Sequence, residues 1–287
     1  MPSKPDPSSR TILLLVVVAA LLTSAVLAPV AHQATSGPDG TVMVVSIGSS
    51  ISGSSVDEAV AHLRDARTND SIEAVVLSVD SPGGSAAQSE RLYMAVERTA
   101  AVMPVVSSVQ GMAASGGYYA VAPTDRIFTL PAAEVGSVGV IATSPPDTPS
   151  SYIKSGPDKA SGRADQTRRE VEELQSAFVE SVLKHRDLNM SRTELEHAKT
   201  YIGIRAVENG LVDEVGTTAD AVDYAANEAG LDSYDVTRRD ASPSMGLLLF
   251  EETANGTVVL SESTDSPYRY YMTVGEPADE VVIYNAS

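Results

Sequence analysis

Short apolar runs rich in β-branched residues alternate with segments whose apolar residues recur at helical spacing. The apolar runs predict buried strands at 42–47, 74–79, 105–109, 127–130 and 138–142. The first helical segment spans 54–68, where Val56, Ala59, Val60 and Leu63 would share one face. Further helices are expected at 86–101 and from about residue 115. Alternating strands and helices predict an α/β fold, with a parallel sheet covered by helices.

The second half of the chain is predicted to be mostly helical. Helical spacing recurs at 166–186, 192–199, 205–209 and 218–229. After about residue 231 the sequence becomes acidic, and two strand-like runs follow at 257–260 and 280–284. We therefore expect one main domain at 42–230, followed by an acidic C-terminal extension of unknown role at 231–287.

The N-terminal region has the features of a membrane anchor. Residues 11–31 run for 21 positions without a charged side chain. A helix of that length spans about 30 Å, the thickness of the hydrocarbon layer of a bilayer. Lys4 and Arg10 precede this run, whereas the next basic residue is Arg64. Since basic residues favour the cytoplasmic side, the N-terminus is predicted to lie in the cytoplasm.

The expected organisation is a single pass through the cell membrane. A cytoplasmic tail at 1–10 precedes the transmembrane helix at 11–31, and a short polar linker at 32–41 leads to the main domain on the extracellular side. A cleaved signal peptide is the alternative. Its apolar core would be long for that role, and Pro29 lies where a small-residue cleavage site is expected.

The amino-acid composition restricts which ligands and catalytic groups are possible. The 287 residues carry 38 Asp and Glu against 20 Lys and Arg, which leaves a formal net charge of −18. This charge excludes nucleic acid as a favoured ligand, because polyphosphate binding needs a basic face. The absence of cysteine excludes disulfides, zinc–thiolate sites and thiol nucleophiles. An acidic surface with only five lysines is typical of proteins from salt-loving organisms.

Two glycine-rich turns directly follow predicted strands. The first is DSPGG at 80–84, and the second is GMAASGGYY at 111–119. The carboxyl ends of parallel strands are where open α/β sheets place their ligand sites. Glycine there lets backbone N–H groups approach a substrate, and Ser115 could expose its hydroxyl beside them. Tight turns alone would also explain the glycines, and neither turn has the lysine-plus-hydroxyl ending of a phosphate-binding loop.

A serine nucleophile needs a base. The four histidines lie at the membrane exit or in charged predicted helices, without a motif that would orient an imidazole. A lysine could serve instead if burial lowered its pKa from about 10.4 towards neutrality. Lys154 and Lys159 lie in a loop-like segment, whereas Lys184 and Lys199 lie on charged helices. Most single lysines are solvated surface groups, so this reasoning alone leaves the base open.

Five strings in order resemble the signal peptide peptidase A family of membrane-bound serine peptidases. The resemblance covers about two-thirds of the chain, from Val42 to about Gly230. The strings are DSPGG at 80–84, MAASGGYY at 112–119, GSVGV at 136–140, KSGPDK at 154–159 and GLVDEVG at 210–216. The resemblance implies the Clp-protease/crotonase-like fold and hydrolysis of peptide bonds by a Ser-Lys dyad, without a metal or another cofactor.

Site residues follow from the same resemblance, position by position. Ser115 matches the nucleophile and Lys159 the general base, while Lys154 matches a preceding lysine that is not catalytic. Ser137 matches a serine that orients the base. The main-chain N–H groups of Gly84 and Gly116 match the donors of the oxyanion hole, although the connection from 140 to 154 is shorter than is usual in the family.

The implied function is a membrane-anchored serine endopeptidase that degrades cleaved signal peptides or other membrane-proximal peptides, acting as a homo-oligomer. Strand addition of an extended apolar peptide is the implied mode of substrate binding. A catalytically inactive scaffold or peptide-binding subunit of the same fold is the alternative. An acyl-CoA enzyme of the related crotonase type is a third reading, which the outward topology and the acidic charge disfavour.

Overall fold

The computed structural model describes residues 37–143, 155, 164–241, 252–253, 256–257 and 270–273. The chain divides into two compact units, Met1–Asp39 and Gly40–Ser287, and every element described below belongs to the second. Several predicted features lie outside the described residues. These are the cytoplasmic tail and anchor at 1–31, nearly all of the strand at 257–260, the strand at 280–284, and the two lysines Lys154 and Lys159.

The main sheet is mostly parallel. Its strand order is β10-β1-β2-β4-β5-β9, and all neighbours along this path are parallel. The short β6 pairs in parallel with β4 and antiparallel with β8. In chain order the strands are β1 (Gly40–Gly48), β2 (Ile72–Ser81), β4 (Val105–Ala114), β5 (Arg126–Thr129), β6 (Glu134–Gly136), β8 (Thr200–Ile202), β9 (Glu214–Val215) and β10 (Tyr234–Asp240).

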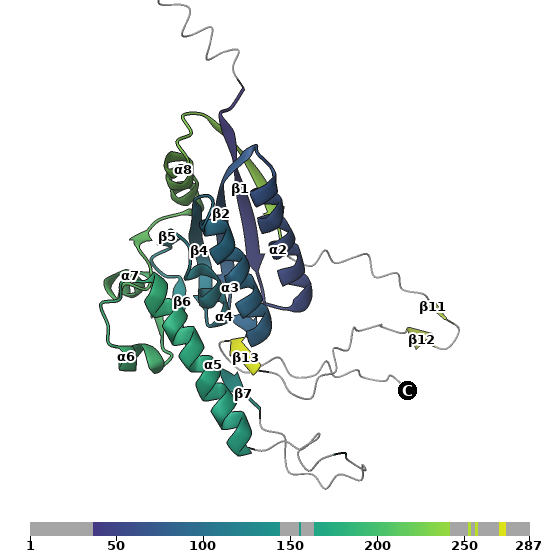
Figure 1. The fold of residues 1–287 in the computed structure, drawn as a ribbon, viewed down its shortest axis with the longest axis vertical. Helices are drawn as coiled ribbons and strands as arrows, with labels where there is room; N and C mark the ends of the chain where they lie inside the picture. The colour runs from purple at the N-terminus through teal and green to yellow at the C-terminus, as the bar shows by residue number, and fades with distance from the viewer. Residues whose placement is uncertain are drawn as a thin grey trace, which may run out of the picture. The chain divides into compact units, whose positions relative to one another are not determined.

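Helices cover both faces of this sheet (Figure 1). On one face, α2 (Gly53–Thr68) and α3 (Ala86–Ala100) pack over a cluster that includes Met43 and Val45. On the other face, α8 (Thr218–Glu228) packs over the alternate residues Val42 and Val44. Successive side chains of a strand point to opposite faces, so a continuous apolar run is what a strand buried on both sides requires.

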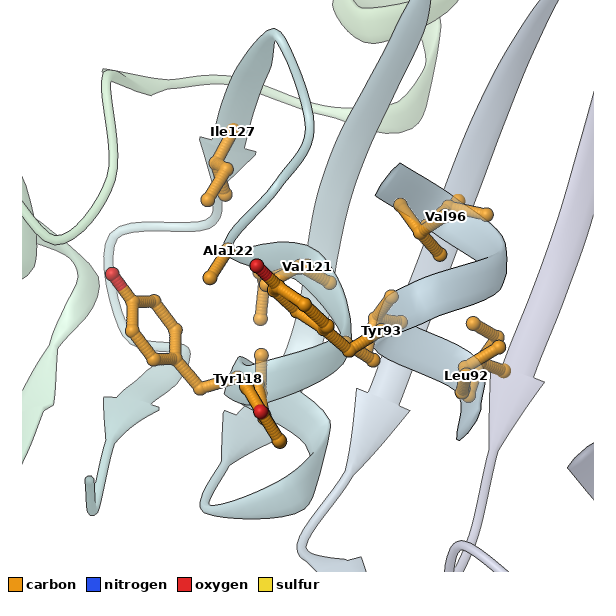
Figure 2. Packing of buried hydrophobic residues seen from close by; sticks show 14 of the residues in the cluster. Leu92, Tyr93, Val96, Tyr118, Val121, Ala122 and Ile127 are labelled. Atoms are coloured by element: carbon orange, nitrogen blue, oxygen red, sulfur yellow. The ribbon is translucent and has the colours of Figure 1, made fainter. Parts of the chain in front are cut away.

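The helix that begins beside the second glycine-rich turn is enclosed by aromatic side chains. It is α4 (Gly116–Val121), and all six of its residues are buried. Tyr119 stacks on Tyr93 of α3, with ring centroids 4.7 Å apart, and lies 4.5 Å from the ring of Phe178. Figure 2 shows buried side chains from α3, among them Leu92, Tyr93 and Val96, with Tyr118 and Val121 of α4. Such ring pairs add to the stabilisation that area burial alone gives, so α4 is held firmly.

The remaining helices follow one another after residue 163. They are α5 (Ala164–His185), which supplies Phe178, then α6 (Arg192–Glu196) and α7 (Gly203–Glu208). Among the described residues, no helix is both long enough and apolar enough to cross a bilayer.

Two smaller sheets contain short strands. β3 (Gly83–Ser85), β13 (Tyr270–Thr273) and β7 (Ile141–Ala142) form a three-stranded sheet in the order β3-β13-β7, with both pairs antiparallel. β11 (Glu252–Thr253) and β12 (Gly256–Thr257) pair with each other. The central strand of the three-stranded sheet therefore comes from the C-terminal extension.

The predicted helices and most predicted strands are confirmed within a few residues. The strand predicted at 138–142 is wrong in part, because β7 contains only 141–142 and residues 137–139 form a tight turn. The short strands β3, β6, β8 and β9 and the edge strand β10 were not predicted. β10 lies beyond residue 230 and pairs with β1 along seven residues, so the main sheet continues into the C-terminal extension.

Leu63 tests the packing of α2. Its side chain is fully buried, whereas Leu183 on α5 is 36% exposed. We expect Leu63→Ala to lower the free energy of unfolding by about 2–5 kcal/mol, because the substitution leaves a cavity that the surroundings fill only in part. Leu183→Ala serves as the control and should cost less than about 1 kcal/mol. Urea denaturation followed by circular dichroism measures both, and equal losses would contradict this account of the core.

Candidate active site

Ser115 lies at the junction between β4 and α4. Its backbone has φ 52° and ψ −119°, a conformation that residues with a side chain rarely adopt. Such strain costs on the order of 1–3 kcal/mol and is found where function requires it. The residue is fully buried, and its hydroxyl donates a hydrogen bond to the carbonyl of Gly139 at 3.2 Å. The sharp turn therefore fixes the direction of the hydroxyl.

Backbone hydrogen bonds hold the turn on both sides of Ser115. The N–H of Ser115 donates to the carbonyl of Gly136 at 2.8 Å, and the carbonyl of Ser115 accepts from the N–H of Tyr119 at 2.9 Å. Gly136 ends β6, whose parallel partner is the end of β4. The position of Ser115 thus depends on two neighbouring strand ends meeting at one edge of the sheet.

The first glycine-rich turn lies against the second. Ser81 at the end of β2 pairs with Ala113 of β4, and a Cβ on Gly117 would come within 2.6 Å of the Ser81 carbonyl. Only glycine allows α4 to begin so close to that carbonyl. The prediction that both turns lie at the carboxyl ends of parallel strands is confirmed, and the two strands, β2 and β4, are neighbours in the sheet.

Gly84 is tightly constrained within β3. The carbonyl of Gly83 accepts from Ile51 N–H at 2.8 Å, and Ser85 N–H donates to the Ile51 carbonyl at 3.0 Å. Because backbone groups of successive residues point to opposite sides of a strand, the N–H and C=O of Gly84 are turned away from Ile51. A Cβ at Gly84 would come within 2.2 Å of the Ile51 carbonyl oxygen, so any other residue would displace β3.

Ser137 begins the tight turn in which the Gly139 carbonyl accepts the hydrogen bond from the Ser115 hydroxyl. It also has a positive φ of 52°, its N–H donates to the Lys199 carbonyl at 2.8 Å, and its carbonyl accepts from Gly139 N–H at 2.8 Å. The structure therefore brings Ser137 to within one short turn of the Ser115 hydroxyl. Lys159, predicted as the base that Ser137 would orient, lies outside the described residues.

No histidine among residues 37–143 and 164–241 hydrogen-bonds to Ser115. His185 on α5 instead contacts the hydroxyl of Tyr93 at 2.9 Å, and burial lowers its pKa below the ordinary value. The hydroxyl of Tyr93 keeps its proton at neutral pH, since burial and the neighbouring Glu97 raise the pKa of Tyr93 to about 12. This cluster belongs to the packing between α3 and α5.

The two tyrosines that follow Ser115 are also poor bases. The hydroxyl of Tyr118 donates to the Leu211 carbonyl at 2.7 Å, and burial raises its pKa well above that of a free phenol. Burial likewise raises the pKa of Tyr119. Both phenols remain protonated at neutral pH, so neither can accept the Ser115 proton there.

Two features of the site were missed by the sequence reasoning. The GSVGV string at 136–140 drew attention to Ser137, but the Gly139 carbonyl is the group that Ser115 contacts. The second feature is β13, which pairs with β3 directly at Gly84. Nothing in the acidic C-terminal sequence pointed to this position.

The conformation of Ser115 leads to a stability prediction. Glycine has no Cβ and adopts a positive φ without strain. The free energy of unfolding of Ser115→Gly should therefore be about 1 kcal/mol higher than that of Ser115→Ala. Ser115→Ala is the matched control, because it also lacks the hydroxyl but keeps the strain. Urea denaturation of the two variants measures the difference, and a Gly variant less stable than the Ala variant would argue against stored strain.

The region that contains Ser115 is similar to known peptidases. Residues 97–147 and 158–232 match peptidase family S49. A candidate protease of Methanocaldococcus jannaschii is 34% identical over 207 residues, which cover 64% of this chain and 65% of that protein. Protease 4 of Salmonella typhi is 33% identical over 208 residues, which cover 66% of this chain and 34% of that protein.

A candidate signal peptide peptidase A of Enterococcus faecium is 30% identical over 191 residues, which cover 60% of this chain and 56% of that protein. The matched part of the chain thus spans between about a third and two-thirds of the length of these three relatives. Among solved structures, a mutant of a membrane-bound stomatin-specific protease aligns with a TM-score of 0.48 and 17% identity, covering 71% of this chain and 99% of that one. The resemblance to a serine peptidase family is confirmed as a match to peptidase family S49, and the matched residues 97–147 and 158–232 contain the strings at 112–119, 136–140 and 210–216.

Proposed function

We propose that this chain is a membrane-anchored serine endopeptidase that uses Ser115 as nucleophile and Lys159 as general base. The observation that carries the proposal is the backbone of Ser115. A buried serine is held at positive φ in a strand-to-helix turn, within a region that matches a peptidase family. Strained backbone of this kind clusters at active sites, where it can hold a reactive side chain in a fixed direction.

The reaction requires a base in addition to the groups around Ser115. The Ser115 hydroxyl donates to the Gly139 carbonyl, and a backbone carbonyl accepts a hydrogen bond but does not remove a proton at neutral pH. In the proposed reaction, Ser115 Oγ attacks the peptide carbonyl while Lys159 Nζ takes the hydroxyl proton. Lys159 then gives this proton to the leaving amine, and water hydrolyses the acyl-enzyme by the same route.

Lys159 can act in this way only if its amine is neutral when substrate binds. Exclusion of water from the site would favour the neutral amine, because desolvation lowers the pKa of a lysine. Ser137 is proposed to orient the amine, since its turn lies next to the hydroxyl of Ser115. Lys154 is proposed to have no part in the chemistry.

The developing oxyanion is proposed to be stabilised by the N–H groups of Gly84 and Gly116. Gly84 N–H is turned away from Ile51, to the side of β3 where a bound peptide would pair, while Gly116 is the first residue of α4, where N–H groups have no partner within the helix. Loss of one such donor typically slows acyl transfer by about 100–1,000-fold.

The proposed substrates are cleaved signal peptides or other membrane-proximal peptides. The support is the uncharged run at 11–31, with basic residues before it. This run would anchor the chain with its peptidase domain outside the cell, where such peptides leave the bilayer. We further propose that the enzyme acts as a homo-oligomer, in which the dyad is completed within one subunit or between neighbours.

The two lysines of the 154–159 segment provide a matched pair of variants. Lys159→Ala should lower kcat/KM for a fluorogenic peptide by about 10³-fold or more, as loss of the base does in serine enzymes with a catalytic triad. Lys154→Ala, only five residues away, should retain activity within about threefold. Ser115→Ala should be as inactive as Lys159→Ala, and circular dichroism checks that all three variants are folded.

Labelling with a fluorophosphonate separates the peptidase from an inactive scaffold of the same fold. Attachment of the probe to Ser115, identified by mass spectrometry, is expected for the wild type and should be lost in Lys159→Ala. Full turnover by Lys159→Ala would refute the dyad. Failure of the wild type both to label and to cleave peptides would favour the scaffold.

A further inference from the structure

Strand β13 occupies a space between two segments that border the site. On one side, Tyr271, Met272 and Thr273 pair antiparallel with Ser85, Gly84 and Gly83 of β3. On the other side, Tyr270 and Tyr271 pair antiparallel with Ala142 and Ile141 of β7. Figure 1 shows β13 beside β7, at the end of the domain where α3 and α4 lie, and β13 contacts both helices. β3 and β7 thus form the two walls of a groove that accepts one extended chain.

Both walls of this groove belong to the site. β3 contains Gly84, whose N–H is the proposed oxyanion donor. β7 begins at Ile141, two residues after Gly139, whose carbonyl accepts the Ser115 hydroxyl. An extended chain in the groove therefore lies between the two backbone segments that define the reacting position.

The register of β13 places Met272 opposite Gly84. Since Gly83 and Ser85 both bond to Ile51, the N–H and C=O of Gly84 point to the side of β3 where β13 lies. Met272 is the residue paired with Gly84, so the Met272 carbonyl faces the proposed oxyanion donor. In a substrate bound the same way, this carbonyl would belong to the bond that is cut.

We propose that residues 270–273 are the chain's own occupant of the peptide-binding groove, and that a peptide substrate has to displace them. The proposal rests on the proposed function only in taking this groove as the place where substrate binds. Ser115 is fully buried in the arrangement with β13 in place, so access to its hydroxyl requires a covering segment to move. The extension after β10 is then a built-in competitor of substrate.

The length of the connection suits a reversible competitor. β10 ends at Asp240 and β13 begins at Tyr270, 30 residues later, and such a connection can reach roughly 100 Å when extended. A tether of this length can hold its end at an effective concentration of up to about millimolar. The strand would therefore compete well with micromolar peptide, yet leave the groove readily for a tighter ligand.

The test weakens only the pairing of β13 with β3. Met272→Pro removes the N–H that faces Gly84, while proline still permits an extended backbone. Glu262→Pro is the matched control, because it places the same substitution in the extension but outside β13. Both are made in the full chain carrying Ser115→Ala, so that binding is measured without hydrolysis.

The probe is a fluorescein-labelled synthetic peptide with the sequence of residues 266–276, titrated with protein and followed by fluorescence anisotropy. Met272→Pro should bind it about tenfold more tightly than the Ser115→Ala parent, whereas Glu262→Pro should match the parent within twofold. Equal affinity for all three proteins would overturn the proposal, as would absence of binding to all three.

Hydrogen–deuterium exchange gives a second readout that does not depend on an added ligand. The backbone amides of 83–85 and 270–273 should exchange several-fold faster in Met272→Pro than in the parent or in Glu262→Pro. Unchanged exchange at 83–85 would contradict the pairing. Every protein in this test lacks the nucleophile, so a negative result would contradict only the proposal that residues 270–273 occupy the groove. The proposed peptidase would be contradicted separately, if Lys159→Ala hydrolysed peptides as fast as the wild type.

Discussion

The hydrogen bond from Ser115 N–H to the Gly136 carbonyl ties the end of β4 to the end of β6, and the geometry of the site depends on it. It holds the serine at positive φ and brings its hydroxyl to Gly139 in the turn that follows. The cost of this backbone, on the order of 1–3 kcal/mol, is offset by the burial of α4 immediately after it. A tightly packed helix therefore maintains a strained turn that could not persist alone.

The sequence predicted those elements whose burial pattern is unambiguous. The apolar runs at 42–47 and 74–79 are strands in the middle of the sheet, covered on both faces. The edge strand β10 could not be predicted in this way, since most of its residues are exposed and its sequence is polar. The strand expected at 138–142 was too long because the turn around Ser137 interrupts the apolar run, and a run of residue types does not reveal a positive φ.

The candidate site was predictable in its local parts only. The strings at 80–84 and 112–119 located Gly84 and Ser115, because glycine-rich turns after strands are visible in the chain itself. The sequence did not predict that the Gly139 carbonyl accepts a hydrogen bond from Ser115, nor that β13 pairs with β3 and β7. Both depend on pairing between residues far apart in the sequence, and a backbone carbonyl has no residue type by which to be recognised. The base stays a prediction from the resemblance to the family.

The aromatic contact between α4 and α5 has a consequence for Lys159. Phe178 of α5 lies against Tyr119 of α4, so the helix that follows the lysine segment is fastened to the helix that follows the serine. α5 begins at Ala164, five residues after Lys159, and five residues of chain reach at most about 18 Å. The five-residue tether limits how far the Lys159 amine can lie from α5, which reduces the entropy that the proposed dyad would lose when it assembles.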